Sequence, residues 1–292
     1  MFATAVAHAH KFTAPVVISS KTLEGKVASA CGAFVVINNE GWIVTAAHVF
    51  DAQRVLAEHR KAHAEYLATR KTIENDTSLK ANKKRKMISR LPFSENWLES
   101  VSLWWGNDRL KTGDVHMNLL ADIAITRLQN FNPAPDQIYP VFGNPSAKLP
   151  PGTSLCKIGF PFHSIQTTFD DTNRLFRFEA GALPIPWFAL DGIVARYQVL
   201  KNQADKTEAT FLQMSTPGLK GQSGGPVFDK NGIVWGIQVR TESLELGFQP
   251  EITKDGKRIA EHQFLNVGIA AYVSELFAMF QKFNVKHDVA NA

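Results

Sequence analysis

The sequence predicts an all-β fold, a sandwich or a barrel, that carries one helical insertion and one helix near its end. Short segments rich in β-branched and aromatic residues recur along most of the chain, separated by Gly, Pro, Asn and Asp. Residues 52–90 contain neither glycine nor proline and show a helical spacing of apolar residues instead. The chain has 292 residues, 45% of them apolar and 20% charged, which suits a single globular unit with a large core.

The first expected strands form a hairpin. "GAFVVI" at 32–37 and "WIVTAA" at 42–47 enclose the turn signal "NNEG" at 38–41. His48 closes the second apolar run. Because a polar imidazole at the end of a buried strand needs hydrogen-bonding partners, His48 is a candidate functional residue.

The helical insertion is the basic part of the chain. Residues 54–90 contain eleven Lys or Arg and four Asp or Glu, a net charge of 11 − 4 = +7, so the rest of the +5 chain carries 5 − 7 = −2. Its last part, "KANKKRK" at 80–86, is typical of a solvated helix face. A contact with nucleic acid or with a regulatory partner is the alternative.

Seven further strands are expected between the insertion and the last helix. Prolines gather in "PAPD" at 133–136 and "NPSAKLPPG" at 144–152, which we interpret as the crossing between two halves of the fold. A terminal helix is expected over 274–283, with Ser274 as a candidate N-cap. The seven strands are "SVSLWWG" at 100–106, "DIAITRL" at 122–128, "SLCKIGFP" at 154–161, "DGIVARYQVL" at 191–200, "ATFLQMS" at 209–215, "GIVWGIQVR" at 232–240 and "FLNVGIAAYV" at 264–273.

A serine lies within a cluster of glycines in "LKGQSGGPV" at 219–227. Glycines permit backbone conformations that let amide groups face outward beside the hydroxyl of Ser223. A serine hydroxyl is a weak nucleophile until a base accepts its proton, and that base needs an orienting group. His48 is the candidate base, and Asp122, at the start of an apolar strand, is the candidate orienting acid.

The glycines also indicate a site for a developing negative charge. If Gly221 and Ser223 direct their N–H groups at one point, they form an oxyanion hole, in which each donor contributes roughly 10²–10³ in rate. "GQSGG" also fits the G-x-S-x-G motif of α/β-hydrolases, but a hairpin pattern follows it rather than a helix. The chain order histidine, aspartate, serine differs from the hydrolase order too, because the hydrolase histidine comes last.

At these residues the chain resembles the trypsin-like, chymotrypsin-fold serine peptidases. Among them it is more similar to the bacterial HtrA/Deg type, here without a PDZ domain, than to the disulfide-rich secreted type. "TAAHV", "ADIAI" and "GQSGGPV" match the three catalytic motifs, and the resemblance runs from about Ala28 to Phe283, interrupted by the insertion. It implies that His48 is the general base, Asp122 the orienting group and Ser223 the nucleophile of a serine endopeptidase that forms an acyl-enzyme.

The resemblance also implies a single domain over residues 1–292, built from two six-stranded antiparallel β-barrels with the site in the cleft between them. Barrel one would cover about 15–135 with the helical insert at about 52–92. Barrel two would cover about 150–273, followed by the C-terminal helix at about 273–284.

By the same resemblance, the substrate would lie along one strand. Gln238, Val239 and Arg240 would pair with the substrate backbone. Pro217 and Thr241 would line the pocket for P1, the substrate residue before the scissile bond. No aspartate stands at the Pro217 position, so a preference for Lys or Arg is not indicated and we expect a small or medium apolar P1.

The chain departs from the family pattern in three places. Gln222 precedes the nucleophile where secreted relatives carry an aspartate that pairs with a newly cut N-terminus, so that activation route is excluded. No cysteine follows His48, and the few residues after the last helix are too short for a PDZ domain.

Cysteine usage and apolar runs bear on the compartment. Cys31 and Cys156 are too few for a disulfide-stapled secreted domain, and whether they form a single bridge stays open. The first residues lack a signal-peptide pattern, and no 18 consecutive residues are apolar. We expect a cytoplasmic protein that needs no membrane, metal or other cofactor.

The leading hypothesis is a serine endopeptidase acting on protein or peptide substrates and steered by a partner. An inactive or partner-gated trypsin-like binding module is the alternative, although the intact triad and Gly221 argue against it. A nucleic-acid-associated protein using the insertion at 54–90 is a third possibility.

Overall fold

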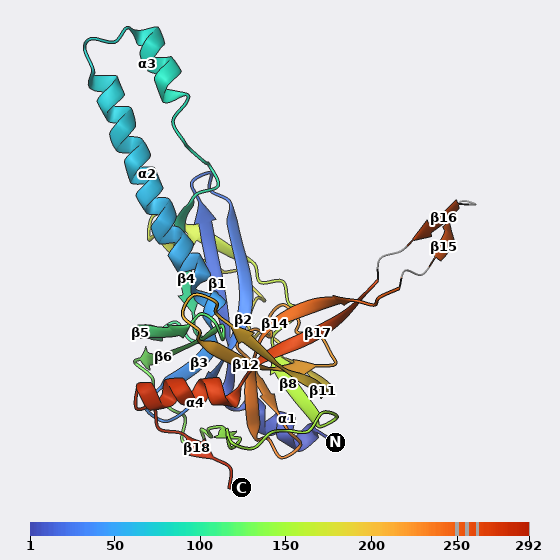
Figure 1. The fold of residues 1–292 in the computed structure, drawn as a ribbon. Helices are drawn as coiled ribbons and strands as arrows, with labels where there is room; N and C mark the ends of the chain where they lie inside the picture. The colour runs from blue at the N-terminus through green and yellow to red at the C-terminus, as the bar shows by residue number, and fades with distance from the viewer. Residues whose placement is uncertain (249–250, 255–256, 261–262, 292) are drawn as a thin grey trace.

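The computed structural model describes residues 1–248, 251–254, 257–260 and 263–291, and two main β-sheets dominate it (Figure 1). The prediction of an all-β fold with a helical insertion and a terminal helix is confirmed. Buried side chains from both sheets, including Phe34 and Ile125 of the first and Phe211 and Ile237 of the second, belong to one apolar cluster. The core therefore joins the two halves.

The first sheet has six strands in the order β4-β1-β2-β3-β6-β5, and every neighbouring pair is antiparallel. Within the described residues the edge strands β4 and β5 do not pair with each other, so this sheet is a half-barrel. Its strands are β1 (Thr13–Thr22), β2 (Val27–Val36), β3 (Trp42–Ala46), β4 (Leu98–Trp104), β5 (Lys111–Asn118) and β6 (Ile123–Gln129).

The second sheet closes on itself. Six antiparallel strands follow one another as β13-β8-β11-β12-β17-β14, and β14 pairs back to β13. Each half thus has the six main strands that the resemblance implied, but only the second half forms a hydrogen-bonded ring. These strands are β8 (Ser154–Gly159), β11 (Phe188–Lys201), β12 (Glu208–Met214), β13 (Pro226–Phe228), β14 (Val234–Glu245) and β17 (Phe264–Tyr272), with the short parallel additions β7 (Val141–Phe142) and β18 (Asp288–Val289).

The insertion consists of two helices, α2 (Asp51–Asn75) and α3 (Ala81–Ile88), which project from the first sheet (Figure 1). The helical segment expected from the missing Gly and Pro is interrupted, because Asp76 accepts the Ser78 N–H in a turn that ends α2. Buried Leu56 holds the base of α2, whereas α3 has no buried residue. Neither these helices nor any other in the described ranges is long and apolar enough to cross a membrane.

The terminal helix α4 (Val273–Lys282) packs through Leu276 and Phe280, which are fully buried. The expected N-cap is wrong. Tyr272 occupies that position without a side-chain cap, and Ser274 lies in the first turn, where its hydroxyl donates to Glu275. A short helix at the other end of the chain, α1 (Ala3–His10), was not predicted.

Several strands lie where the sequence pattern predicted none. β1 carries Pro15 near its start, and the side chains of β5 are exposed or only half-buried, so neither shows a clear apolar alternation. Two small hairpins were also missed, β9 (Thr167–Asp170) with β10 (Leu175–Phe178) and β15 (Glu251–Lys254) with β16 (Lys257–Ala260). The long pair β14 and β17 extends away from the body toward β15 and β16 (Figure 1).

The two cysteines do not form a bridge. Cys31 is half-buried, Cys156 is buried, and both are free thiols. Burial raises the pKa of the Cys31 thiol to about 12 and that of Cys156 to about 11. Neither is a thiolate at neutral pH, so neither is an activated nucleophile.

Candidate active site

Two adjacent strands of the first sheet bring His48 and Asp122 together. His48 lies in the 3-10 turn η1 (Ala47–Phe50) after β3, and Asp122 immediately precedes β6, the neighbour of β3. The Asp122 carboxylate accepts the His48 backbone N–H at 3.0 Å, and its other oxygen lies 2.8 Å from the ring Nδ1. The Asp122 carbonyl also accepts the Ala47 N–H at 3.0 Å. The aspartate therefore fixes both the imidazole and the turn that carries it.

Asp122 adopts a left-handed backbone conformation, with φ of 54°. Such a conformation costs a non-glycine residue on the order of 1 kcal/mol and persists only where surrounding interactions hold it. Here it lets one residue bind the histidine turn through its carbonyl and its carboxylate together. The local strain is consistent with a functional position.

The electrostatics of this pair favour a charged imidazole. The hydrogen bond to Asp122 raises the pKa of His48 above its ordinary value of 6.5, and burial opposes that effect. With Nδ1 engaged by the carboxylate, Nε2 is the ring nitrogen that can accept a proton. The His48 side chain is 40% exposed, so a substrate can reach it.

The loop that carries Ser223 depends on glycine. Gly221 and Gly224 have φ of 98° and 88°, in the left-handed region that favours glycine. A Cβ on Gly224 would lie 2.0 Å from the Ala33 carbonyl oxygen and 2.3 Å from the Thr45 hydroxyl. The glycine cluster of the sequence therefore lets the loop approach the first sheet at contact distance.

Backbone contacts dock Ser223 beside the histidine turn. The Ser223 carbonyl accepts the Ala33 N–H of β2 at 2.7 Å. A Cβ on Gly32 would lie 3.2 Å from that same carbonyl and 3.4 Å from the side chain of Val49, the residue after His48. The structure describes both His48 and Ser223, and it shows no hydrogen bond between their side chains.

Two amides in this loop remain available. The N–H groups of Gln222, Gly224 and Gly225 donate to backbone carbonyls at 2.8 to 2.9 Å. Those of Gly221 and Ser223 have no acceptor in the described part of the chain. The Gly221 carbonyl accepts the Phe160 N–H at 2.8 Å, and this hydrogen bond helps to hold the loop in place. The free N–H pair is the one that the sequence predicted for an oxyanion hole.

Gln222 is a buried polar residue inside the same loop. Its side-chain oxygen accepts the Leu219 N–H at 3.0 Å, so it closes the turn before the serine. Its amide nitrogen is buried with no partner among the described residues. A neutral glutamine therefore supports the loop where secreted relatives use a charged aspartate.

The predicted substrate residues lie on two segments next to this loop, the segment before the serine and β14. The side chains of Gln238 and Val239 are buried, Arg240 and Pro217 are half-buried, and Thr241 is exposed. The Thr241 hydroxyl donates to the Gly218 carbonyl at 2.5 Å, which ties β14 to the segment before the serine. A bulge at Val239 leaves this residue outside the ladder with β17.

Three residues that sequence reasoning missed complete this region. Thr45 is fully buried, and its hydroxyl donates to the Ala33 carbonyl at 2.7 Å beside the serine loop. Gly32 is the contact point between Ser223 and Val49. Lys157 lies fully buried in β8, and a lysine in the otherwise apolar "SLCKIGF" was the signal for it.

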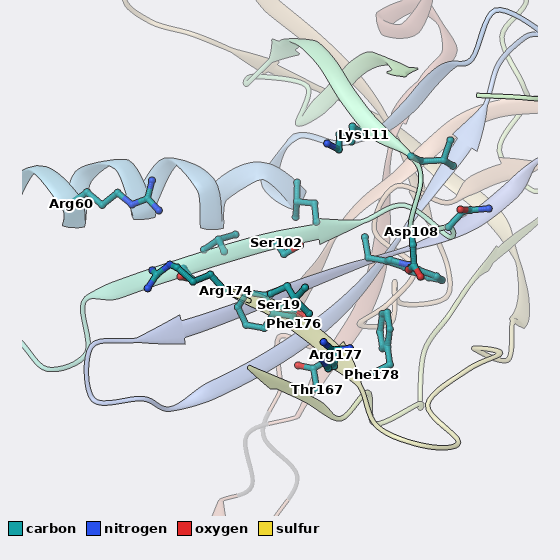
Figure 2. A pocket seen from close by; sticks show the side chains of 17 residues that line it. Ser19, Arg60, Ser102, Asp108, Lys111, Thr167, Arg174, Phe176, Arg177 and Phe178 are labelled. Atoms are coloured by element: carbon teal, nitrogen blue, oxygen red, sulfur yellow. The ribbon is translucent and has the colours of Figure 1, made fainter. Parts of the chain in front are cut away.

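A separate cavity lies away from these residues. Figure 2 shows it between the base of α2, β4 and the β9–β10 hairpin, with Arg60, Arg174, Arg177 and Phe178 among its lining residues. His48, Asp122 and Ser223 do not line it. Arg174 pairs with Glu99 at 3.3 Å and Arg177 with Asp170 at 2.9 Å, so carboxylates of the chain itself already bind two of its cations.

Comparisons with known proteins identify the family of the chain and its fold. A family model described as a trypsin-like peptidase domain matches residues 32–237. No curated protein matches the chain in sequence. The active form of the Rv3671c protease from M. tuberculosis is 14% identical with a TM-score of 0.51, covering 98% of this chain and 86% of that one. At this identity the likeness reports on the fold alone.

Two further solved structures are more distant in shape. The inactive form of the Rv3671c protease is 15% identical with a TM-score of 0.46, covering 96% of this chain and 92% of that one. An HtrA-type protease, AlgW, with a tripeptide is 14% identical with a TM-score of 0.47, covering 96% of this chain and 62% of that one.

Proposed function

This chain belongs to the trypsin-like peptidase family and is a serine peptidase, and we propose that it is an endopeptidase whose catalytic triad is His48, Asp122 and Ser223. The observation that carries the proposal is the double contact of the Asp122 carboxylate with the ring and the backbone of His48. The hydrogen bond from the Ala33 N–H to the Ser223 carbonyl also supports the proposal, because the neighbouring Gly32 lies between Ser223 and Val49, the residue after His48.

In the first step, His48 Nε2 takes the proton of the Ser223 hydroxyl while Oγ attacks the carbonyl carbon of the substrate. Asp122 holds the proton of His48 on Nδ1 and stabilises the imidazolium that forms. The ring and the serine are not hydrogen-bonded in this structure, and catalytic hydrogen bonds of free enzymes often tighten only when substrate binds.

The negative oxygen of the tetrahedral intermediate would bind to the N–H groups of Gly221 and Ser223. Both donors lack an acceptor in the described part of the chain, so no existing bond has to break. Each donor contributes roughly 10²–10³ in rate.

The intermediate collapses when the His48 imidazolium donates its proton to the leaving amine. This breaks the peptide bond, releases the first product and leaves the acyl group on Ser223 Oγ. His48 then takes a proton from water, the hydroxide attacks the ester carbonyl, and Ser223 recovers its proton as the acid product leaves.

The proposal is tested by digestion of a diverse peptide library with the wild type and with Ser223→Ala. We expect cuts by the wild type and a loss of roughly 10⁶ in kcat for the variant, because the nucleophile is removed. Ser146→Ala is the matched control, since Ser146 is exposed and only its backbone N–H is engaged. Equal cleavage by the wild type and Ser223→Ala would overturn the proposal and favour a binding module.

The helical insertion supports a second, separate proposal, that α3 contacts an acidic partner such as nucleic acid. α3 has no buried residue, and its sequence "ANKKRKMI" contains four consecutive cations and no acid. A basic surface of this kind binds phosphates with a characteristic salt dependence. The salt dependence of DNA binding tests this proposal independently of catalysis.

A further inference from the structure

Lys157 is a cation enclosed by the second sheet. Its side chain is 0% exposed, and its Nζ donates to the Thr216 carbonyl at 2.8 Å. No carboxylate in the described ranges forms an ion pair with it. Burial lowers the pKa of Lys157 to about 8, so the ammonium is still the main form at neutral pH. An ammonium has three N–H donors, and this one uses a single acceptor.

An unpaired polar atom lies beside this ammonium. A Cβ on Gly268 would lie 2.7 Å from Lys157 Nζ and 3.1 Å from Gln238 Oε1, so both atoms face the bare Cα of Gly268. Gln238 Oε1 is buried without a partner in the described part of the chain. The Thr216 hydroxyl is also buried without a partner there, but it faces Gly192, where a Cβ would lie 2.6 Å from it. The Lys157 ammonium, with unused N–H donors, and the unpaired Gln238 oxygen thus form a polar cluster. Buried polar groups are normally satisfied, so this cluster indicates a place that a ligand completes.

The cluster lies between the two walls that flank the serine loop. One wall is the segment that leads to Ser223, whose Thr216 carbonyl also accepts the Gly268 N–H at 2.8 Å. The other wall is β14, where the Gln238 carbonyl accepts the Gly224 N–H at 2.8 Å. The Gln238 backbone is thus bonded to the residue after Ser223, while its side chain reaches the cluster.

Glycine lets the backbone of both walls approach these polar side chains at contact distance. A Cβ on Gly218 would lie 2.2 Å from the Gln238 amide nitrogen, and a Cβ on Gly268 would strike the Lys157 ammonium. The Gln238 amide is held in place because its nitrogen donates to the carbonyls of Arg240 and Ile269. Its oxygen is therefore the atom turned toward the cluster.

We propose that this cluster is the floor of the P1 pocket and that Lys157 makes the enzyme selective for an acidic P1 residue, glutamate or aspartate. The inference rests on the proposed function. A P1 carboxylate would accept hydrogen bonds from the free N–H groups of Lys157. An apolar P1 would leave the buried ammonium with one partner, which costs free energy. The earlier expectation of an apolar P1 considered the Pro217 position and not the buried strand behind it.

The experiment compares kcat/KM for matched peptides that differ only at P1, with Glu, Gln, Leu or Lys. For the wild type we expect Glu to exceed Gln and Leu by tenfold or more. Lys157→Met should reduce cleavage after Glu by roughly 10²-fold, as for removal of one partner of a buried charge pair, and leave Leu unchanged or improved. Lys230→Met is the matched control, because Lys230 is an exposed lysine in the turn between β13 and β14.

Labelling of Ser223 by a fluorophosphonate separates the possible failures. Normal labelling with no preference for Glu over Gln and Leu overturns the role of Lys157 and leaves the triad intact. Absence of both labelling and cleavage overturns the triad and the P1 assignment together. If Lys157→Met does not fold, the P1 profile of the wild type alone decides, because a preference for Leu contradicts a cationic floor.

Discussion

Replacing Asp122 by asparagine tests the most detailed part of the site. The carboxylate serves two donors, the His48 backbone N–H at 3.0 Å and the ring Nδ1 at 2.8 Å. An asparagine has only one oxygen. The backbone N–H can only donate, so the amide oxygen must stay with it and the NH₂ group then faces Nδ1. Because NH₂ donates, Nδ1 has to accept, and the ring proton moves to Nε2.

The wrong tautomer places a proton on the nitrogen that must accept one from Ser223. We expect Asp122→Asn to fold normally and to lose about 10⁴-fold in kcat/KM. This is the loss of rate that the same substitution causes in a Ser-His-Asp catalytic triad. This corresponds to about 5.5 kcal/mol of transition-state stabilisation. Asp136→Asn, at an exposed aspartate, is the control.

The assay is kcat/KM on a good peptide substrate together with the far-UV circular dichroism of each variant. A folded Asp122→Asn enzyme that keeps activity within tenfold of the wild type would refute the reasoning about the tautomer. Loss of activity in Asp136→Asn as well would show that the assay measures overall stability instead.

The remaining predictions concern the pH profile, the serine loop and the insertion. Because Asp122 raises the pKa of His48 and catalysis needs the neutral ring, kcat/KM of the wild type should rise with pH through a midpoint above 6.5, and a midpoint below 6.5 would contradict this. Gly224→Ala should lower the free energy of unfolding by about 1–3 kcal/mol and abolish activity, because the new Cβ would lie 2.0 Å from the Ala33 carbonyl oxygen. Thermal unfolding measures the first effect and a peptide cleavage assay the second. An unchanged Tm would contradict this prediction. Neutralising Lys83 to Lys86 should remove most of the salt dependence of any DNA binding, and an unchanged slope of log K against log salt excludes α3 as the contact.

The motif residues show how much of the site could be predicted. His48 and Asp122 each end or begin an apolar strand, and a polar residue in that place indicates a partner. The structure brings these two together through β3 and β6, 74 residues apart in sequence. Lys157 carried the same signal, but its partner Thr216 lies 59 residues away on a loop with no motif of its own, so its surroundings became visible only in three dimensions.

The elements missed in the fold have a common physical cause. The residues of β5 are at most half-buried, and those of β9 are similar, so neither shows the alternation that identifies a strand in sequence. The break between α2 and α3 depends on a local turn at Asp76, which competes with a helix that composition alone favours. Ser274 was expected at the cap because of its residue type, whereas the last residue of β17 fixes where α4 begins.

Mass-spectrometric mapping of a fluorophosphonate adduct measures the central claim most directly, that His48 activates Ser223. We expect one modified residue, Ser223, in the wild type and a drop in the labelling rate of at least about 10³-fold in His48→Ala. Modification of a different serine, or equal labelling of Ser223 in wild type and His48→Ala, would contradict it.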